Sequence, residues 1–584
     1  MKAVLMQRVS ENARRVESNY FVWILCVASI ILFILTVDSL TITDLEPYGL
    51  YYLRILPVTY WAGVGAAVAA IMISMLYDMR RRNDIRIIPV LVLCLFLFGT
   101  PVFTYEVPRF TDIFAHGAEA LPVISNGQID SDDRYAREYP SPFVLLGISA
   151  ILQDIAPLAL IRFAELFTIL VVITLVYCIA RTTNSRFSAL APISFMGAFW
   201  VDQGHFSPQG LALVFYMVFF LAIIKAISTS ESRRGWLATA FVMLLAINFT
   251  SPTNSLFLVL NLATVAIVAF AVFRRKNLVS NRVIVFTALA GAIFLSWSIY
   301  NAESRTVLRA EEFERTLADN FGTENVQLTP SPSTSYQLVL NLRLLVVGFV
   351  LLSGTAVSIM LIRRKQKSHY VIILVGWFAT ASFIAISMYL SPVLLSRNFM
   401  YVSIPWALLM TVFFAQNLPV KKDKVAKAVV LSIVVILLVS IPATRYGRDP
   451  TTYASSSLVS SADALAAASK GGERVISYSI GSFATKYYAA VHGVDVDTKT
   501  FDRVFQNSYY DRDMDAMVDW LHSQSIVGRV IFSDPEKNNI AMKFDEPQLY
   551  EQLEESVEED HNLIINSGST RVYSSTSGVA LTEE

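Results

Sequence analysis

The segment 105–142 holds the side chains best suited to chemistry, set between long apolar runs. It contains seven acidic and three basic residues. Asp112 and His116 lie four residues apart, so a helix here would present both side chains on one face. A carboxylate in that position can accept a proton from an attacking hydroxyl or bind a metal ion. The alternative is a surface helix in which Asp112 pairs with Arg109 and His116 is solvated.

Further polar residues of the same segment extend this candidate site. Glu119 follows Asp112 by seven residues and would lie on the same helical face. The run DSDD at 130–133 offers three acids that could bind a cation or form a solvated turn. Tyr139 precedes Pro140 where a new helix is expected to begin, since proline is favoured in a first helical turn.

A second polar stretch, WVDQGHFSPQG at 200–210, interrupts two apolar runs. Its candidate substrate-binding side chains are Asp202, Gln203 and His205. Ser207 is expected to cap a helix that begins at Pro208, and the positive end of that helix would favour an anion. The alternative is an ordinary polar turn between two helices.

Charged residues within apolar runs are the remaining candidates. Arg397 lies at the end of a late run, where a guanidinium could hold a phosphate with two hydrogen bonds. It could instead extend its charge toward the membrane surface or form an ion pair within the bundle. Arg162 and Glu165 lie three residues apart in one run, and we expect them to pair with each other because isolated intramembrane charges are costly.

The composition indicates a polytopic membrane protein. Of the 584 residues, 54% are hydrophobic and 16% are charged, against about 25% charged in a typical soluble domain. Residues 446–584 carry 22 acidic and 11 basic residues, so an acidic tail follows a basic membrane part. This distribution gives no reason to expect nucleic acid as a partner. The three cysteines all lie in apolar runs, which argues against a disulfide framework or a cysteine metal site.

Thirteen apolar runs approach the length needed to cross a bilayer. They cover approximately residues 20–38, 55–77, 86–104, 156–180, 187–202, 207–227, 235–250, 252–273, 282–299, 337–362, 369–391, 395–415 and 427–444. Every second connecting loop is rich in Lys and Arg, which predicts a cytoplasmic N-terminus and an extracytoplasmic C-terminus. The run at 141–153 is too short to span and is expected to be an interfacial helix.

The predicted organisation is a membrane domain at 1–445 followed by an extracytoplasmic α/β domain at 446–584. Two long loops, 105–140 and 300–336, lie on the same outer side. In the tail, 473–479 and 527–534 are predicted strands and 510–523 and 546–559 predicted helices, with a hairpin over 562–575 turning near Gly568. Neither the GxGxxG nor the GxxxxGK[ST] phosphate-binding pattern occurs in it.

These features together resemble the GT-C superfamily of polytopic glycosyltransferases, which includes protein O-mannosyltransferases, aminoarabinose transferases and oligosaccharyltransferase catalytic subunits. The points of resemblance are Asp112 in RFTDIFAHGAEA, Tyr139-Pro140, HFSPQG at 205–210, Arg397, and a tail that ends in NSGSTRVYSS. The resemblance covers most of the chain as architecture and few positions as motif. The tail lacks a WWD-type peptide-binding motif, which separates it from oligosaccharyltransferase proper.

The resemblance implies that a sugar is transferred from a polyprenyl-phosphate donor in the membrane to a glycan, lipid or protein acceptor. Asp112, with His116, would act as the base or hold a divalent metal, Mg²⁺ or Mn²⁺. Arg397 and His205 would stabilise the leaving phosphate. The other implied substrate contacts are Asp202, Gln203, Arg109, Glu119 and Tyr139.

One departure from the superfamily leaves the choice of catalytic carboxylate open. The acidic loop normally follows the first span, whereas Asp112 follows the third. Asp38, Asp44 and Glu46 lie in the first outer loop and are alternatives. A transporter or lipid flippase, and a non-catalytic assembly subunit, are the alternative functions; no internal repeat favours a transporter.

Overall fold

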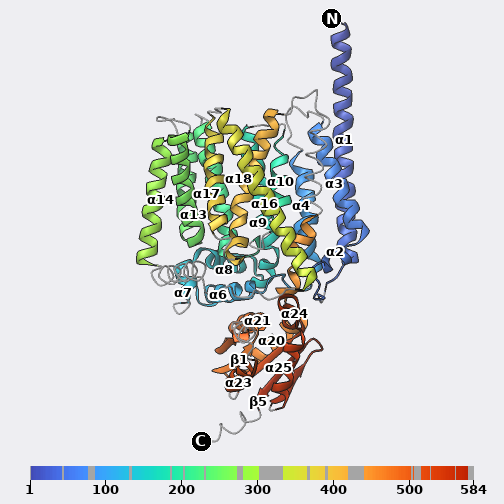
Figure 1. Cartoon of the computed structure of the whole chain (residues 1–584), viewed down its shortest axis with the longest axis vertical. Helices are drawn as coiled ribbons and strands as arrows, with labels where there is room; N and C mark the ends of the chain where they lie inside the picture. Colours follow the sequence, from blue (N-terminus) through green and yellow to red (C-terminus); the bar gives the residue numbers. More distant parts are fainter. Residues whose placement is uncertain are drawn as a thin grey trace.

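The computed structural model describes most of the chain. The described ranges are residues 2–42, 45–76, 86–130, 134–183, 187–200, 204–228, 232–272, 280–301, 333–364, 368–387, 392–417, 440–501, 504–505, 514–525, 528–559 and 561–575. A bundle of long helices fills one part of the molecule, and a smaller part containing a sheet lies against one end of it (Figure 1).

The bundle is built from long helices joined by short ones. Its first helices are α1 (Lys2–Ser39), α2 (Tyr51–Ile55), α3 (Val58–Leu76), α4 (Ile87–Cys94), the π-helical turn η1 (Leu95–Gly99), α5 (Thr100–Thr104), α9 (Pro157–Thr183), α10 (Leu190–Ala198) and α11 (Pro208–Ser228). It continues with α12 (Arg233–Asn248), α13 (Pro252–Ile267), η3 (Val268–Val272), α14 (Ser280–Tyr300), α16 (Thr334–Arg363), α17 (His369–Ser387) and α18 (Pro392–Asn417).

Nine of the described helices are long and apolar enough to cross a membrane, so the chain is a polytopic helical membrane protein. Three of the thirteen candidate runs are described but are not among these nine. Helix α10 has nine residues, α12 has sixteen, and the apolar part of α14 is the shorter stretch Ile284–Tyr300. Most of the run at 427–444 lies outside the described residues, as does the loop at 302–332.

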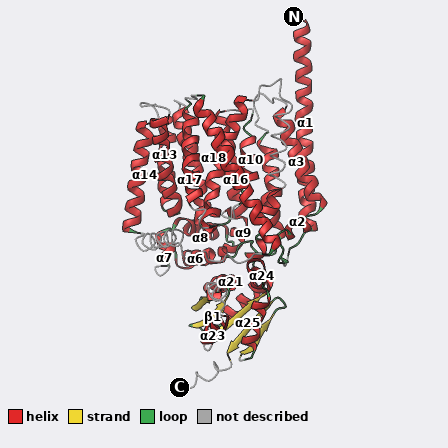
Figure 2. Cartoon of the chain, viewed as in Figure 1, coloured by secondary structure: helices red, strands yellow, loops and turns green. Residues whose placement is uncertain are grey.

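The polar segment after α5 folds into three short helices at the bundle end that faces the sheet (Figure 2). They are α6 (Asp112–Asn126), α7 (Arg134–Glu138) and α8 (Ser141–Gln153). The expected helix through Asp112 and His116 is therefore confirmed. It ends at Gly127, whose φ of 71° is a left-handed conformation that glycine adopts without steric cost. The short helix expected at 141–153 is also present.

The C-terminal part is a five-stranded mixed sheet with helices, as expected for an α/β fold. Its strands are β1 (Glu473–Ser477), β2 (Val496–Thr500), β3 (Gly528–Ser533), β4 (His561–Asn566) and β5 (Thr570–Ser575), and their spatial order is β2-β1-β3-β5-β4. The first three strands are parallel, and β5 pairs antiparallel with β3 and β4. Its helices are η4 (Asp449–Thr451), α20 (Ser456–Ala468), α21 (Ser479–His492), α23 (Met514–Ser525), α24 (Asp534–Phe544) and α25 (Gln548–Glu558).

Helix α6 lies between the bundle and the C-terminal part. Phe114 of α6 makes an edge-to-face contact with Tyr487 of α21, at a centroid separation of 6.1 Å. At Gly117, an added Cβ would lie 3.0 Å from the Tyr487 ring, so the absence of a side chain allows this close approach. A second contact joins α24 to the loop after α1, where Asn538 donates a hydrogen bond to the Leu45 carbonyl at 2.7 Å.

Candidate active site at the start of helix α6

Asp112 and His205 meet at the bundle end that carries α6. Asp112 is the first residue of α6, and its Oδ2 lies 3.1 Å from Nε2 of His205. The His205 side chain is 4% exposed, whereas that of Asp112 is 45% exposed. The imidazole is therefore fixed inside the protein while the carboxylate can be reached from outside. This arrangement suits a general base whose orientation is set by a buried partner.

Local structure on both sides of His205 holds its ring in place. Ser207 accepts a hydrogen bond from the backbone N–H of Gly210 at 3.0 Å, so the expected cap before Pro208 is confirmed. Phe110 lies beside the imidazole with a centroid separation of 4.6 Å. Phe110 also contacts the guanidinium of Arg109, which lies 4.4 Å from the ring centroid. The histidine is thus held by aromatic packing as well as by Asp112.

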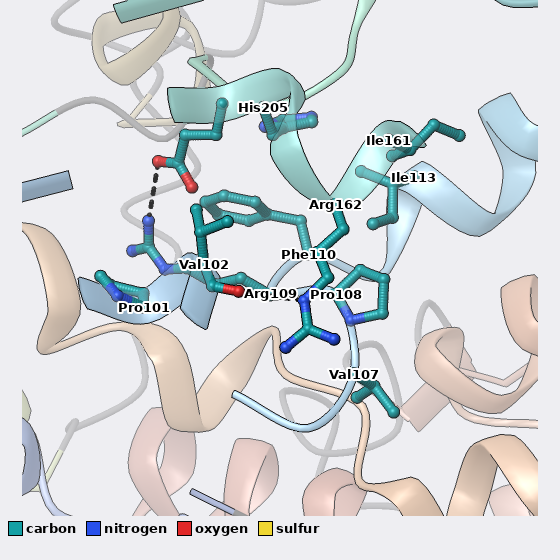
Figure 3. A pocket seen from close by; sticks show the side chains of 11 residues that line it. Pro101, Val102, Val107, Pro108, Arg109, Phe110, Ile113, Ile161, Arg162 and His205 are labelled. Carbon is teal, nitrogen blue, oxygen red and sulfur yellow. Dashed lines mark hydrogen bonds and ion pairs between the residues drawn. The ribbon is translucent and has the colours of Figure 1, made fainter. Parts of the chain in front are cut away.

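A small pocket opens next to this pair (Figure 3). It is lined by Pro101, Val102, Val107, Pro108, Arg109, Phe110, Ile113, Ile161, Arg162, Glu165 and His205. These residues come from α5, the segment that follows it, α6, α9 and the turn before α11. Asp112 adjoins the pocket through His205. Apolar walls with a few convergent charged groups are typical of a ligand site.

Behind the pocket lies a buried cluster of four charged side chains. Arg109 donates to Asp449 through Nε at 2.9 Å and Nη2 at 2.6 Å, and it forms an ion pair of 3.1 Å with Glu165. Arg445 contacts the same Glu165 oxygen. Tyr105 donates to Asp449 at 2.6 Å. Two cations and two anions balance one another, which fits the rule that buried charges require partners.

The same cluster determines the electrostatics of Arg109. Burial alone would lower the pKa of Arg109, but the charges of Asp449 and Glu165 raise it well above its usual value. This arginine was a candidate substrate contact in the sequence analysis. Its guanidinium is instead engaged by two carboxylates, so it fixes the segment that leads into α6.

The expected pairing of Arg162 with Glu165 is wrong. Arg162 donates to three backbone carbonyls, those of Val102 at 2.9 Å, Tyr105 at 2.5 Å and Glu106 at 3.4 Å. Residues three positions apart lie on a similar side of a helix, which was the basis for expecting this pair. Glu165 instead forms ion pairs with Arg109 and Arg445, which come from distant segments of the chain. The dashed line in Figure 3 marks the ion pair of Glu165 with Arg109.

His116 and Glu119 form a separate pair one turn further along α6. The His116 Nδ1 lies 3.2 Å from a carboxylate oxygen of Glu119. The imidazole packs among aromatic rings, with centroids 5.9 Å from Phe143 and 6.5 Å from Phe206. Neither residue lines the pocket. The shared helical face thus divides into an Asp112–His205 contact and a His116–Glu119 contact.

The other candidate residues differ in their placement. Tyr139 is buried where α7 meets α8, and its ring packs 6.0 Å from that of Tyr135. Asp202, Gln203, Asp44, most of the DSDD run and the side chain of Arg397 lie outside the described residues. Of the competing carboxylates, Glu46 forms an exposed 3.6 Å ion pair with Arg54, and Asp38 is exposed at the end of α1.

The described residues do not complete a metal site. Asp112 and His205 are only two side chains of a type that binds metals, and within the described ranges no group of three or more His, Cys, Asp or Glu side chains is arranged to hold a metal ion. Catalytic metal sites usually have three protein ligands or more. No step of the reaction proposed below is therefore assigned to a metal.

Sequence reasoning missed the contribution of Arg445 and Asp449. Both lie in RYGRDP, just after the last apolar run, where charged residues are expected in an exposed linker. Both are instead fully buried, at 0% and 1% exposure. The only local signal was the presence of Glu165 within a span, since a carboxylate there requires a cationic partner.

Comparisons with known proteins give distant structural likenesses only. No protein-family model matches the sequence, and no curated protein matches it. The oligosaccharyltransferase of Archaeoglobus fulgidus, solved with zinc and sulfate, is 13% identical with a TM-score of 0.49, over 84% of this chain and 73% of that one. ArnT from Cupriavidus metallidurans is 12% identical both in its apo state (TM-score 0.45, 81% and 94% covered) and bound to undecaprenyl phosphate (0.44, 88% and 98%). These values describe a distant similarity of the overall fold only. No side-chain role is taken from them, and the roles discussed below rest on the geometry described above.

Proposed function

We propose that this protein is a membrane glycosyltransferase that uses a polyprenyl-phosphate sugar as donor and Asp112 as general base. One observation carries the proposal: a half-exposed carboxylate is oriented by a buried histidine beside a pocket at the end of a membrane-spanning bundle. The resemblance of the sequence to the GT-C superfamily supports the same donor class. The positive-inside pattern predicts that this end of the bundle faces outside the cytoplasm, which supports an extracytoplasmic acceptor.

In the proposed reaction, an acceptor hydroxyl attacks the anomeric carbon of the donor sugar. The new bond joins the acceptor oxygen to that carbon, and the bond from the carbon to the phosphate oxygen breaks. The hydroxyl proton passes to the Asp112 carboxylate, and polyprenyl phosphate leaves as an anion. Because this leaving group is already stable, positioning and anion stabilisation supply most of the rate enhancement.

His205 has an orienting role in this scheme. By holding Oδ2 of Asp112 at 3.1 Å, it leaves the second carboxylate oxygen available to the acceptor hydroxyl. A base must lie within about 2.6–3.2 Å of the group it deprotonates. Fixing the rotamer of Asp112 therefore increases the fraction of time that its carboxylate spends in a reactive position.

The test is sugar transfer by Asp112→Asn. Surface glycans and lipid-linked sugars are compared by mass spectrometry in cells that carry the wild-type gene, the variant or a deletion. We expect the variant to lower transfer by about 10²- to 10⁴-fold, the range for general bases. Glu551→Gln is the matched control, because it changes an exposed carboxylate paired with Lys537 in the C-terminal part. Full transfer by a folded Asp112→Asn would reject Asp112 as the base.

A further inference from the structure

Arg162 is a pocket cation that forms no ion pair with a carboxylate of the described residues. The pocket also contains Arg109 and Glu165, but these belong to the neutral four-charge cluster with Arg445 and Asp449. The three hydrogen bonds of Arg162 all go to uncharged backbone carbonyls. No carboxylate among the described residues lies within ion-pair distance of it. Its positive charge is therefore available to an anion in the pocket.

The guanidinium also retains hydrogen-bonding capacity. An arginine side chain has five N–H donors, and three of those of Arg162 are used. One N–H on each terminal nitrogen remains, and two such donors suit the oxygens of a phosphate. Carbonyl contacts at the end of α5 account for the orientation of this side chain. They do not account for the presence of a charge within a candidate span.

An exposed apolar strip begins next to Arg162. Phe163 is 46% exposed, and Phe167, one helical turn further along α9, is 66% exposed. Phe103 of α5 is 42% exposed and packs edge-to-face on Phe163 at 5.9 Å. A cation at the pocket and aromatic rings on the adjacent lipid-facing surface match an amphiphile with an anionic head and an apolar chain.

We propose that Arg162 binds the phosphate of a polyprenyl phosphate and that Phe103, Phe163 and Phe167 contact the first part of its isoprenoid chain. This inference rests on the proposed function for the identity of the donor. It assigns the phosphate to Arg162, which the sequence pattern had paired with Glu165, whereas the resemblance had implied Arg397 and His205 for this role. The geometry also orients the donor, with its head toward Asp112 and His205 and its chain along α9.

The experiment measures equilibrium binding of radiolabelled farnesyl phosphate to the full chain in phosphatidylcholine nanodiscs, corrected with empty discs. We expect Arg162→Gln to raise the dissociation constant by about 10- to 100-fold, the usual effect of losing a charged hydrogen bond. Arg162→Lys keeps the charge without the planar fork, so its dissociation constant should lie between those of wild type and Arg162→Gln. Arg54→Gln, which changes an exposed arginine paired with Glu46, should bind as wild type does.

Two competitors distinguish the phosphate from the chain. Farnesol lacks the phosphate and should compete equally weakly in wild type and Arg162→Gln; inorganic phosphate lacks the chain and should compete poorly in both. The double variant Phe163→Ala/Phe167→Ala should weaken farnesyl phosphate binding by about tenfold, whereas Phe241→Ala, on the exposed surface of α12, should not.

Several results would overturn the assignment. These are unchanged affinity in Arg162→Gln, an equal loss of farnesol binding in that variant, or inorganic phosphate competing as well as the lipid. Binding is measured without sugar transfer, so the outcome is separate from that of the Asp112 test. If wild type binds farnesyl phosphate through Arg162 yet transfers no sugar, the proposed function fails and the site assignment stands.

Discussion

Arg109 donates two hydrogen bonds to Asp449, from Nε to Oδ2 at 2.9 Å and from Nη2 to Oδ1 at 2.6 Å, although the two residues are 340 positions apart in sequence. One partner lies three residues before the candidate base, and the other begins the segment that enters the C-terminal part. The contact therefore ties the start of α6 to the chain connection between the two parts of the molecule.

We predict that Asp449→Asn destabilises the protein strongly. Removing one member of a buried charge cluster leaves its partner uncompensated and costs about 3–5 kcal/mol. The apparent melting temperature should fall by roughly 5–10 °C. It can be followed with a thiol-reactive dye, because Cys26 and Cys94 are buried in the folded chain. Asp463→Asn, which changes an exposed partner of His492, is the control and should shift it little. Equal melting temperatures for the two variants would contradict a structural role for the cluster.

We predict that His205→Asn lowers kcat by roughly 10- to 100-fold while the donor KM changes little. The variant loses the imidazole that fixes Asp112, and orientation of a base contributes to the chemical step. Steady-state kinetics with varied donor separate the two constants, and His492→Asn serves as a histidine control in the C-terminal part. A raised KM with unchanged kcat would mean that His205 contacts the donor phosphate instead, as the GT-C resemblance implied.

We predict that ionisation of Glu536 makes the stability of the C-terminal part depend on pH. This carboxyl is fully buried, and it accepts hydrogen bonds from the Gly481 N–H at 3.0 Å and the Tyr550 hydroxyl at 2.8 Å. Burial raises its pKa from 4.5 to about 7, although these hydrogen bonds act in the opposite direction. Between these two pH values the folded state keeps a proton that the unfolded state releases. Stability from this group is therefore greatest below pH 4.5 and decreases as the pH rises to about 7, by on the order of 3 kcal/mol.

The measurement is the apparent melting temperature at several pH values for wild type and Glu536→Gln. The variant cannot ionise at this position, so the part of the decrease between pH 4.5 and 7 that comes from Glu536 should disappear. Glu551→Gln changes an exposed carboxyl paired with Lys537 and should retain the wild-type profile. A Glu536→Gln profile identical to that of wild type would show that ionisation of Glu536 is not coupled to folding.

The distribution of Lys and Arg predicts which side of the membrane each end of the bundle faces. Asn562→Cys places an exposed thiol on β4, and Arg234→Cys places one at the start of α12 in a predicted cytoplasmic loop. A membrane-impermeant maleimide should label the first variant in intact cells and the second only after permeabilisation. The reverse labelling pattern would place the candidate site in the cytoplasm and remove the basis for an extracytoplasmic acceptor.

Local sequence patterns predicted the helices and strands around the candidate site, but the pairing of its side chains depends on tertiary contacts. The spacing of Asp112 and His116 predicted a helix, and Ser207-Pro208 predicted where α11 begins, because capping and proline preferences act over a few residues. The antiparallel pair β4 and β5 was equally visible around Gly568. In contrast, β2 was missed: Val496–Thr500 contains Asp497 and Lys499, which are uncommon in strands and lie at the edge of this sheet.

The pairs that hold the candidate site together lie far apart in sequence. Asp112 and His205 are separated by 93 positions, and Glu165 and Arg445 by 280. Nothing in a local window indicates such partners. Local spacing therefore predicted an ion pair between Arg162 and Glu165. In the folded chain Glu165 pairs with Arg109 and Arg445 instead, and Arg162 pairs with no carboxylate of the described residues.

The close contact of Gly117 with Tyr487 limits how this protein can move. Because α6 begins with the candidate base and contacts Tyr487 of α21 through Phe114 and Gly117, outward movement of the C-terminal part would separate Phe114 from Tyr487. Such a hinge would also pull Asp449 away from Arg109. If the proposed function holds, the geometry at the start of α6 persists only while the C-terminal part stays against the bundle, and we expect the lipid donor to reach the pocket by lateral diffusion in the membrane.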